Sequence, residues 1–184
     1  LGNVSAIGRG FEMLKELGLI DKYPRLVCAQ AQQADPLYRS YKSGFKKFEA
    51  IQAKTTLASA IQIGDPVSVK KAIKTLQTFD GIVEEATESE LANAVGRANL
   101  TGLFCCPHTG VALAVLEKLV NQGKIKKNDR VVVVSTANGL KFTDFLHKYH
   151  TGNLEGISSE FAYSPINLPA DYEKVKETIL NSVD

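Results

Sequence analysis

Short apolar runs alternate with amphipathic helical patterns along most of this 184-residue chain. The apolar runs are 25–29, 81–86 and 131–134, and the helical patterns are 5–17, 68–79, 88–98, 107–119 and 171–180. Strands that alternate with helices are typical of a mainly parallel sheet with helices on both faces. The sequence therefore predicts an α/β fold. Residues 1–150 are expected to belong to one α/β domain, and residues 151–184 to form a C-terminal extension with a short helix.

The run of four valines, 131–134, predicts the most clearly buried strand of the chain. It leads into Ser135, Thr136, Ala137, Asn138 and Gly139. In open α/β sheets, ligands bind beyond the carboxyl ends of the strands, so these hydroxyl and amide groups are candidates for a polar ligand pocket. The alternative is an ordinary strand-to-helix turn.

A second candidate site is the sequence Gly2-Asn3, which precedes the first helical pattern. Glycine lets a backbone approach an anion closely, and a helix N-terminus offers unpaired N–H groups and a positive dipole end. The competing and favoured interpretation is that Asn3 only N-caps the helix.

The third candidate is Cys105-Cys106-Pro107-His108-Thr109-Gly110. A cysteine and a histidine close together can form a nucleophile and base, or bind a metal. No HExxH or CxxC pattern accompanies them, so no metal ligands are assigned, and packing of the helix that starts at Pro107 is favoured. The acidic pair Glu84-Glu85 is interpreted as a solvated strand end.

The composition excludes some classes of protein and of partner. Hydrophobic residues make up 44% of the chain and the net charge is only +2, which argues against disorder and against a nucleic-acid or membrane partner. The three cysteines, two of them adjacent, make a poor disulfide framework. The chain opens on Leu1-Gly2-Asn3 without an initiator Met, and we interpret it as a piece of a longer protein.

Several motifs, taken in order, resemble those of the threonine synthases. Leu1-Gly2-Asn3 resembles the end of their phosphate loop, and five further motifs follow. These are the sequences at 27–31, 58–66, 81–87 and 106–113, together with 132–142 around Thr136. This family consists of pyridoxal-phosphate enzymes of the tryptophan synthase β-like fold (fold type II). The plant-type members, which work in the plastid stroma, are the most similar.

The resemblance implies a set of roles for residues of this chain. Leu1, Gly2 and Asn3 would surround the 5′-phosphate of pyridoxal 5′-phosphate, and Asn3 would also meet the substrate's phosphate. Thr136 would hydrogen-bond the pyridine nitrogen. Many relatives have Glu-Pro where this chain has Cys106-Pro107, so the resemblance assigns no role to Cys106 or to His108.

The implied reaction converts O-phospho-L-homoserine and water to L-threonine and phosphate through Schiff-base chemistry on the cofactor. The Schiff-base lysine is expected upstream of Leu1, so the chain holds no catalytic residue of its own and is predicted to be inactive alone. The resemblance also implies a homodimer, with S-adenosylmethionine as effector of the plant form through residues outside this chain. The location would be the plastid stroma for a plant protein and the cytoplasm otherwise.

Two alternatives remain open at this point. The chain could come from another fold-type-II enzyme, such as a threonine dehydratase or cysteine synthase. It could also be a non-catalytic α/β binding module.

Overall fold

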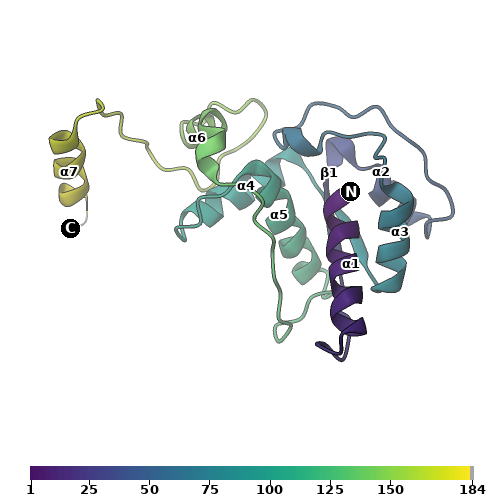
Figure 1. The fold of residues 1–184 in the computed structure, drawn as a ribbon. Coiled ribbons are helices and arrows are strands. Elements are labelled where there is room, and N and C mark those ends of the chain that lie inside the picture. The colour runs from purple at the N-terminus through teal and green to yellow at the C-terminus, as the bar shows by residue number, and fades with distance from the viewer. Residues whose placement is uncertain (183–184) are drawn as a thin grey trace.

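The computed structural model describes residues 1–182 and has an α/β architecture (Figure 1). Its sheet consists of two parallel strands, β1 (Val27–Ala31) and β2 (Ile82–Ala86). Val27 pairs with Ile82 at one end of the ladder and Ala31 with Ala86 at the other. Parallel strands need a long crossover, and here it contains α2 (Pro36–Lys42) and α3 (Val69–Thr78).

Helices cover both faces of this sheet, as the sequence predicts. Ala31, Ile82 and Ala86 point to the face covered by α4 (Glu88–Asn99) and α5 (Pro107–Asn121). Because side chains alternate along a strand, Cys28 and Val83 point to the other face. There they pack with α2, α3 and the start of α1 (Gly2–Glu16). The fully buried side chains on the first face include Leu91 and Leu119, so the main core lies between the sheet and α4–α5.

A second cluster joins α6 (Thr143–His150) to the outer side of α4. Val95, Phe145 and Tyr149 are buried in it, and Leu154 and Ile157 pack against it from the following loop. The described part of the extension then leaves the body, and α7 (Tyr172–Asn181) stands apart in Figure 1 with no buried residue. The predicted helix at 171–180 is confirmed; residues 183–184 of the predicted extension lie outside the described residues.

Short 3-10 turns complete the structure. They are η1 (Gln32–Ala34), η2 (Ser59–Ile61) and η3 (Gly139–Phe142). Within residues 1–182, no helix has both the length and the apolar character needed to cross a membrane.

The first helix starts earlier than its pattern predicts. Its N-cap is Leu1, without a side-chain cap, so Asn3 lies inside the first turn and the N-cap interpretation of Asn3 is wrong. The polar, glycine-containing sequence before Ser5 hid this first turn. Gly18 directly after this helix forms the glycine cap typical of a helix C-terminus: its φ is 69° and its N–H donates to the carbonyl of Lys15.

The run Val131–Val134 is not the buried strand that the sequence predicts. It pairs with neither β1 nor β2, and Val132 is 84% exposed. Four valines favour an extended chain, but a strand also needs a hydrogen-bonded neighbour. Such a neighbour is missing beside this run within the described residues, so the apolar run remains exposed.

Candidate functional site

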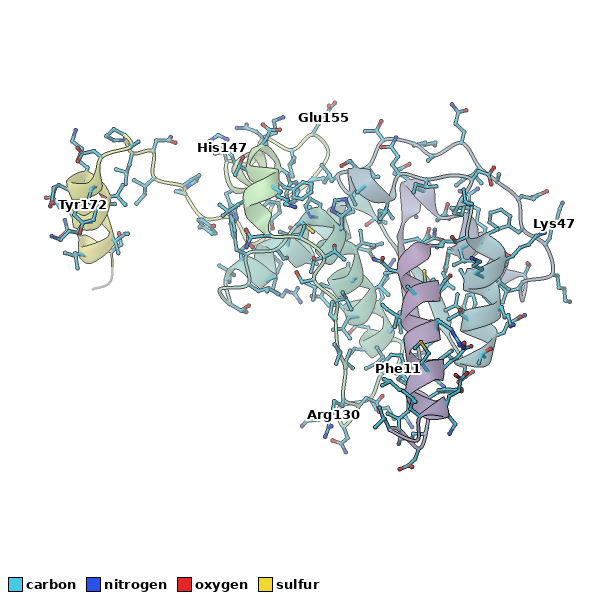
Figure 2. The ribbon with its side chains drawn as sticks, viewed as in Figure 1. Phe11, Lys47, Arg130, His147, Glu155 and Tyr172 are labelled. Carbon is cyan, nitrogen blue, oxygen red and sulfur yellow. The ribbon has the colours of Figure 1, made fainter. Side chains whose placement is uncertain are left out.

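The polar segment after the valine run is held against the N-terminus of α5. Cys105 and Asn138 form an antiparallel bridge, and the N–H of Gly139 donates to the carbonyl of Phe104 over 3.0 Å. A Cβ on Gly139 would lie 2.9 Å from the Phe104 ring, so glycine permits this close approach. The first and third candidate regions from the sequence thus form one site at the N-terminus of α5. Figure 2 draws the side chains of the whole molecule on the same ribbon.

Four hydroxyl and thiol side chains form a continuous chain in this site. The Cys106 sulfur lies 3.9 Å from Thr136 Oγ1 and 3.4 Å from Thr109 Oγ1. Thr109 Oγ1 in turn lies 3.2 Å from Ser135 Oγ. Cys106 and Thr109 are almost completely buried, whereas Thr136 is exposed. This series of hydrogen bonds therefore ends at the Thr136 hydroxyl, which a ligand can reach.

The two adjacent thiols have different environments. Burial raises the pKa of the Cys105 thiol to about 11, because the charged form is poorly solvated in the α4–α6 cluster. Burial acts in the same direction on Cys106, but hydrogen bonds with Thr109 and Thr136 outweigh it and lower the pKa of that thiol. Only Cys106 thus faces polar partners that stabilise its thiolate.

His108 connects α5 to a second loop. Its Nε2 accepts a hydrogen bond from the backbone N–H of Ala60 in η2, over 2.9 Å. Its ring also meets the Phe142 ring edge-on, with the centroids 5.2 Å apart. Burial lowers the pKa of His108, which favours the neutral ring that this hydrogen bond needs. The 58–66 segment, which contains η2, is therefore fixed to the same helix N-terminus.

The acidic pair is not the solvated strand end that the sequence predicts. Glu84 is buried, and its carboxylate accepts hydrogen bonds from Gln122 Nε2 and from the backbone N–H of Glu85. The prediction failed because it treated the pair as the free end of a strand, whereas α5 covers this face of β2. Glu84 stabilises the contact between strand and helix, away from the thiol–hydroxyl chain.

The other predicted site lies at the N-terminus of α1. Gly2 and Asn3 are exposed there, and a Cβ on Gly2 would meet nothing within 4 Å. Leu1 packs against the cluster formed by α2, α3 and the sheet. Within the described residues, no hydrogen bond joins Leu1, Gly2 or Asn3 to Thr136. The structure therefore brings Thr136 together with Cys106 but does not bring it into contact with the α1 N-terminus.

Thr109 and Cys105 lie within a candidate motif from the sequence, but sequence reasoning gave neither of them a role. Thr109 links Cys106 to Ser135, and Cys105 pairs its backbone with Asn138. A signal for Thr109 was present, because residues three apart at a helix start lie on neighbouring positions of one face. No local pattern signals the pairing of Cys105 with Asn138, which are far apart in sequence.

Comparisons with known proteins place this chain in a family. Residues 1–137 match the family described as pyridoxal-phosphate dependent enzyme. The chain is 54% identical over 180 residues to threonine synthase 2, chloroplastic, of Arabidopsis thaliana, covering 97% of this chain and 35% of that protein. It is 33% identical over 144 residues to the threonine synthase of Methanocaldococcus jannaschii, covering 78% of this chain and 36% of that protein. For the threonine synthase of Methanosarcina acetivorans, the identity is 35% over 141 residues, with coverages of 76% and 35%.

An α/β chain with this match over most of its length belongs to the pyridoxal-phosphate dependent enzymes. Threonine synthases from a plant and from archaea are among the proteins it is similar to. The chain spans about a third of the length of these relatives.

Proposed function

We propose that this chain forms part of a threonine synthase, which converts O-phospho-L-homoserine and water to L-threonine and phosphate. The observation that carries the proposal is the 54% identity to a plant threonine synthase over 97% of the chain. The several other threonine synthases that match over most of the chain support this reaction above those of a threonine dehydratase or cysteine synthase.

In this proposal, the N-terminus of α1 binds the phosphate of pyridoxal 5′-phosphate. The helix has 15 residues and its first N–H groups have no side-chain cap, so they are available to an anion. Leu1, Gly2 and Asn3 would supply these backbone donors. The Asn3 amide, exposed beside them, would also bind the substrate's phosphate.

Thr136 is proposed to hydrogen-bond the pyridine nitrogen of the cofactor. Its hydroxyl is exposed and is held from behind by Cys106, which fits a neutral donor to a ring nitrogen. When bound, the cofactor supplies an electron sink for carbanion chemistry next to the substrate's amino group. A hydroxyl, unlike a carboxylate, does not hold a proton on the ring nitrogen, so Thr136 would moderate the strength of that sink.

The Schiff-base lysine is proposed to lie in a part of the full-length protein outside these residues. We therefore assign no catalytic residue to this chain and expect it to be inactive alone. Residues 1–150 would belong to the cofactor-binding domain and residues 151–184 to an extension. The match to the family over 1–137 and the absence of buried residues in α7 support this division.

Partners and location follow from the similarity to plant-type enzymes. We propose a homodimer, with S-adenosylmethionine as effector of the full-length plant form through residues outside this chain. The chloroplastic relative supports the plastid stroma for a plant protein; for another source, the cytoplasm is proposed.

The test uses the full-length protein that contains this chain, loaded with pyridoxal 5′-phosphate. We expect it to release phosphate from O-phosphohomoserine and form threonine. Ammonia release from threonine, or sulfide consumption with O-acetylserine, as the dominant activity would instead identify a threonine dehydratase or a cysteine synthase. Failure to show the absorption of a bound cofactor would identify a non-catalytic module.

Two further measurements test the assignments within this chain. The 184-residue chain alone should not turn over O-phosphohomoserine, and native-like phosphate release by it would contradict the placement of the lysine. Thr136→Val in the full-length protein should shift the absorption of the bound cofactor and lower kcat. Unchanged spectra and kinetics would contradict the role of Thr136.

A further inference from the structure

Cys106 occupies a position that ordinary packing does not explain. Its side chain is fully buried at the N-cap of α5, but it makes no side-chain cap hydrogen bond to the helix. Its sulfur instead lies between the hydroxyls of Thr109 and Thr136, which come from different segments. A buried cysteine usually behaves as a small hydrophobic side chain, as Cys105 does in the α4–α6 cluster. Cys106 is the one placed to exchange hydrogen bonds.

The hydrogen bonds that join Ser135, Thr109, Cys106 and Thr136 can all run in one direction. Each hydroxyl and the thiol carries one hydrogen and can also accept. If Thr136 donates to a ligand, its oxygen is free to accept from the Cys106 S–H. The sulfur then accepts from Thr109, and Thr109 accepts from Ser135, which is consistent with the 3.2 Å and 3.4 Å separations. Every member then donates once, and the last hydrogen points out of the protein.

We propose that Cys106 is a positioning residue, whose neutral thiol directs the Thr136 hydroxyl to donate to the pyridine nitrogen of the cofactor. This inference rests on the role proposed above for Thr136. It assigns a function to Cys106, to which the resemblance assigns none. In this protein a thiol and three hydroxyls would fix the donor without placing a charge behind it.

Loss of the thiol proton would reverse the arrangement. A thiolate has no hydrogen to donate and accepts from both Thr109 and Thr136, so the Thr136 hydrogen would turn inward, away from the ring nitrogen. The titratable neighbours are Cys105, whose pKa burial raises to about 11, and His108, whose pKa burial lowers. Both are neutral where Cys106 ionises. Among these three groups an alkaline change at the cofactor would therefore belong to Cys106, and Cys106→Ala separates it from changes caused by groups outside this chain.

The test uses the full-length holoenzyme and the variants Cys106→Ala, Cys106→Ser, Thr136→Val and the double variant Cys106→Ala/Thr136→Val. Cys28→Ala is the matched control, since Cys28 is a buried thiol among apolar residues on the other face of the sheet. The measurements are kcat, KM, and the cofactor absorption spectrum as a function of pH. Thermal unfolding verifies that each variant is folded.

We expect Cys106→Ala to lower kcat by about tenfold, as for loss of one buried hydrogen bond, with KM changed less than about twofold. Cys106→Ser, which keeps a donor and acceptor, should recover most of that loss. The alkaline change in the spectrum should disappear in Cys106→Ala and persist in Cys28→Ala. In the Thr136→Val background, Cys106→Ala should have almost no further effect.

The outcomes separate this inference from the proposed function. If Thr136→Val lowers kcat but Cys106→Ala has no effect, or the same effect in both backgrounds, Cys106 does not act through Thr136 and the inference is overturned. If Thr136→Val leaves the spectrum and kcat unchanged, the assigned role of Thr136 fails and the inference fails with it. If Cys106→Ala does not fold, Cys106→Ser decides: it should keep most of kcat and lose the alkaline change, because a serine hydroxyl does not ionise in this pH range. A serine variant that keeps the alkaline change would overturn the inference.

Discussion

The Nε2 atom of His108 accepts a hydrogen bond from the backbone N–H of Ala60, 2.9 Å away. This contact joins the second residue of α5 to the 3-10 turn η2, 48 residues earlier in the chain. Since Nε2 must be unprotonated to accept, the contact exists only while His108 is neutral.

The first prediction follows from that requirement. Burial lowers the pKa of His108 in the folded protein, so the unfolded chain binds its proton first as the pH falls. Stability is therefore complete above the ordinary histidine pKa of about 6.5 and decreases as the pH falls below it. In thermal unfolding of the full-length protein between neutral and mildly acidic pH, His108→Gln should weaken the pH dependence, because the amide oxygen accepts without titrating. His147→Gln, on the exposed face of α6, is the control, and equal pH dependence in both variants would contradict the prediction.

The second prediction concerns Asn93, whose side chain hydrogen-bonds to the loop at the start of the C-terminal extension. Its Oδ1 accepts from the Tyr149 hydroxyl over 2.7 Å and from the Glu160 N–H over 3.1 Å, and its Nδ2 donates to the Ser158 carbonyl. Asn93→Ala leaves the buried Tyr149 hydroxyl without this acceptor, which should cost about 1–3 kcal/mol. Hydrogen exchange should also become faster in residues 158–161. Asn93→Asp keeps the acceptor and should lose less; unchanged exchange in the alanine variant would show that the loop is held by other contacts.

The third prediction concerns the contact between α4 and α5. A Cβ on Gly110 would lie 2.5 Å from both the Leu91 carbonyl oxygen and Val95, so the helices would have to move apart. Gly110→Ala should therefore destabilise the protein by about 1–3 kcal/mol. Gly10→Ala is the matched control within a helix: its Cβ meets nothing within 4 Å, and the higher helix propensity of alanine should stabilise by about 0.5–1 kcal/mol. Equal melting temperatures for the two variants would contradict this assignment.

The fourth prediction tests the start of α4. Thr87 Oγ1 accepts from the Glu90 N–H, and the Glu90 carboxylate accepts from the Thr87 N–H over 2.7 Å. Thr87→Ala should cost about 1 kcal/mol of unfolding free energy, whereas Thr87→Ser should retain most of it. Chemical denaturation of both variants provides the comparison. A serine variant as unstable as the alanine variant would show that the methyl group, and not the hydroxyl, is responsible.

Features set by neighbours in sequence were predictable from the sequence. Two such features are the capping box at Thr87 and Glu90 and the glycine cap at Gly18. Each involves residues a few positions apart, so the local sequence alone specifies it. A sheet covered by helices on both faces was also predictable, because the alternation of strands and helices determines it.

Features that depend on distant residues were not predictable in this way. Val131–Val134 has the composition of a buried strand, but a strand forms only beside a partner, and composition does not reveal whether one is present. Cys106 and Thr136 are 30 residues apart, so the sequence indicated each as a candidate without joining them. Asn93 gave no signal, because its partners come from α6 and the loop after it.

The exposed valine run has a practical consequence for work with this chain by itself. An extended, uncharged segment with free backbone donors and acceptors is a template on which another such segment can add. Concentrated solutions of the 184-residue chain should therefore self-associate through 131–134, with Val132 exposed at its centre. Val132→Lys would place a charge on that template and keep the chain dispersed for spectroscopy.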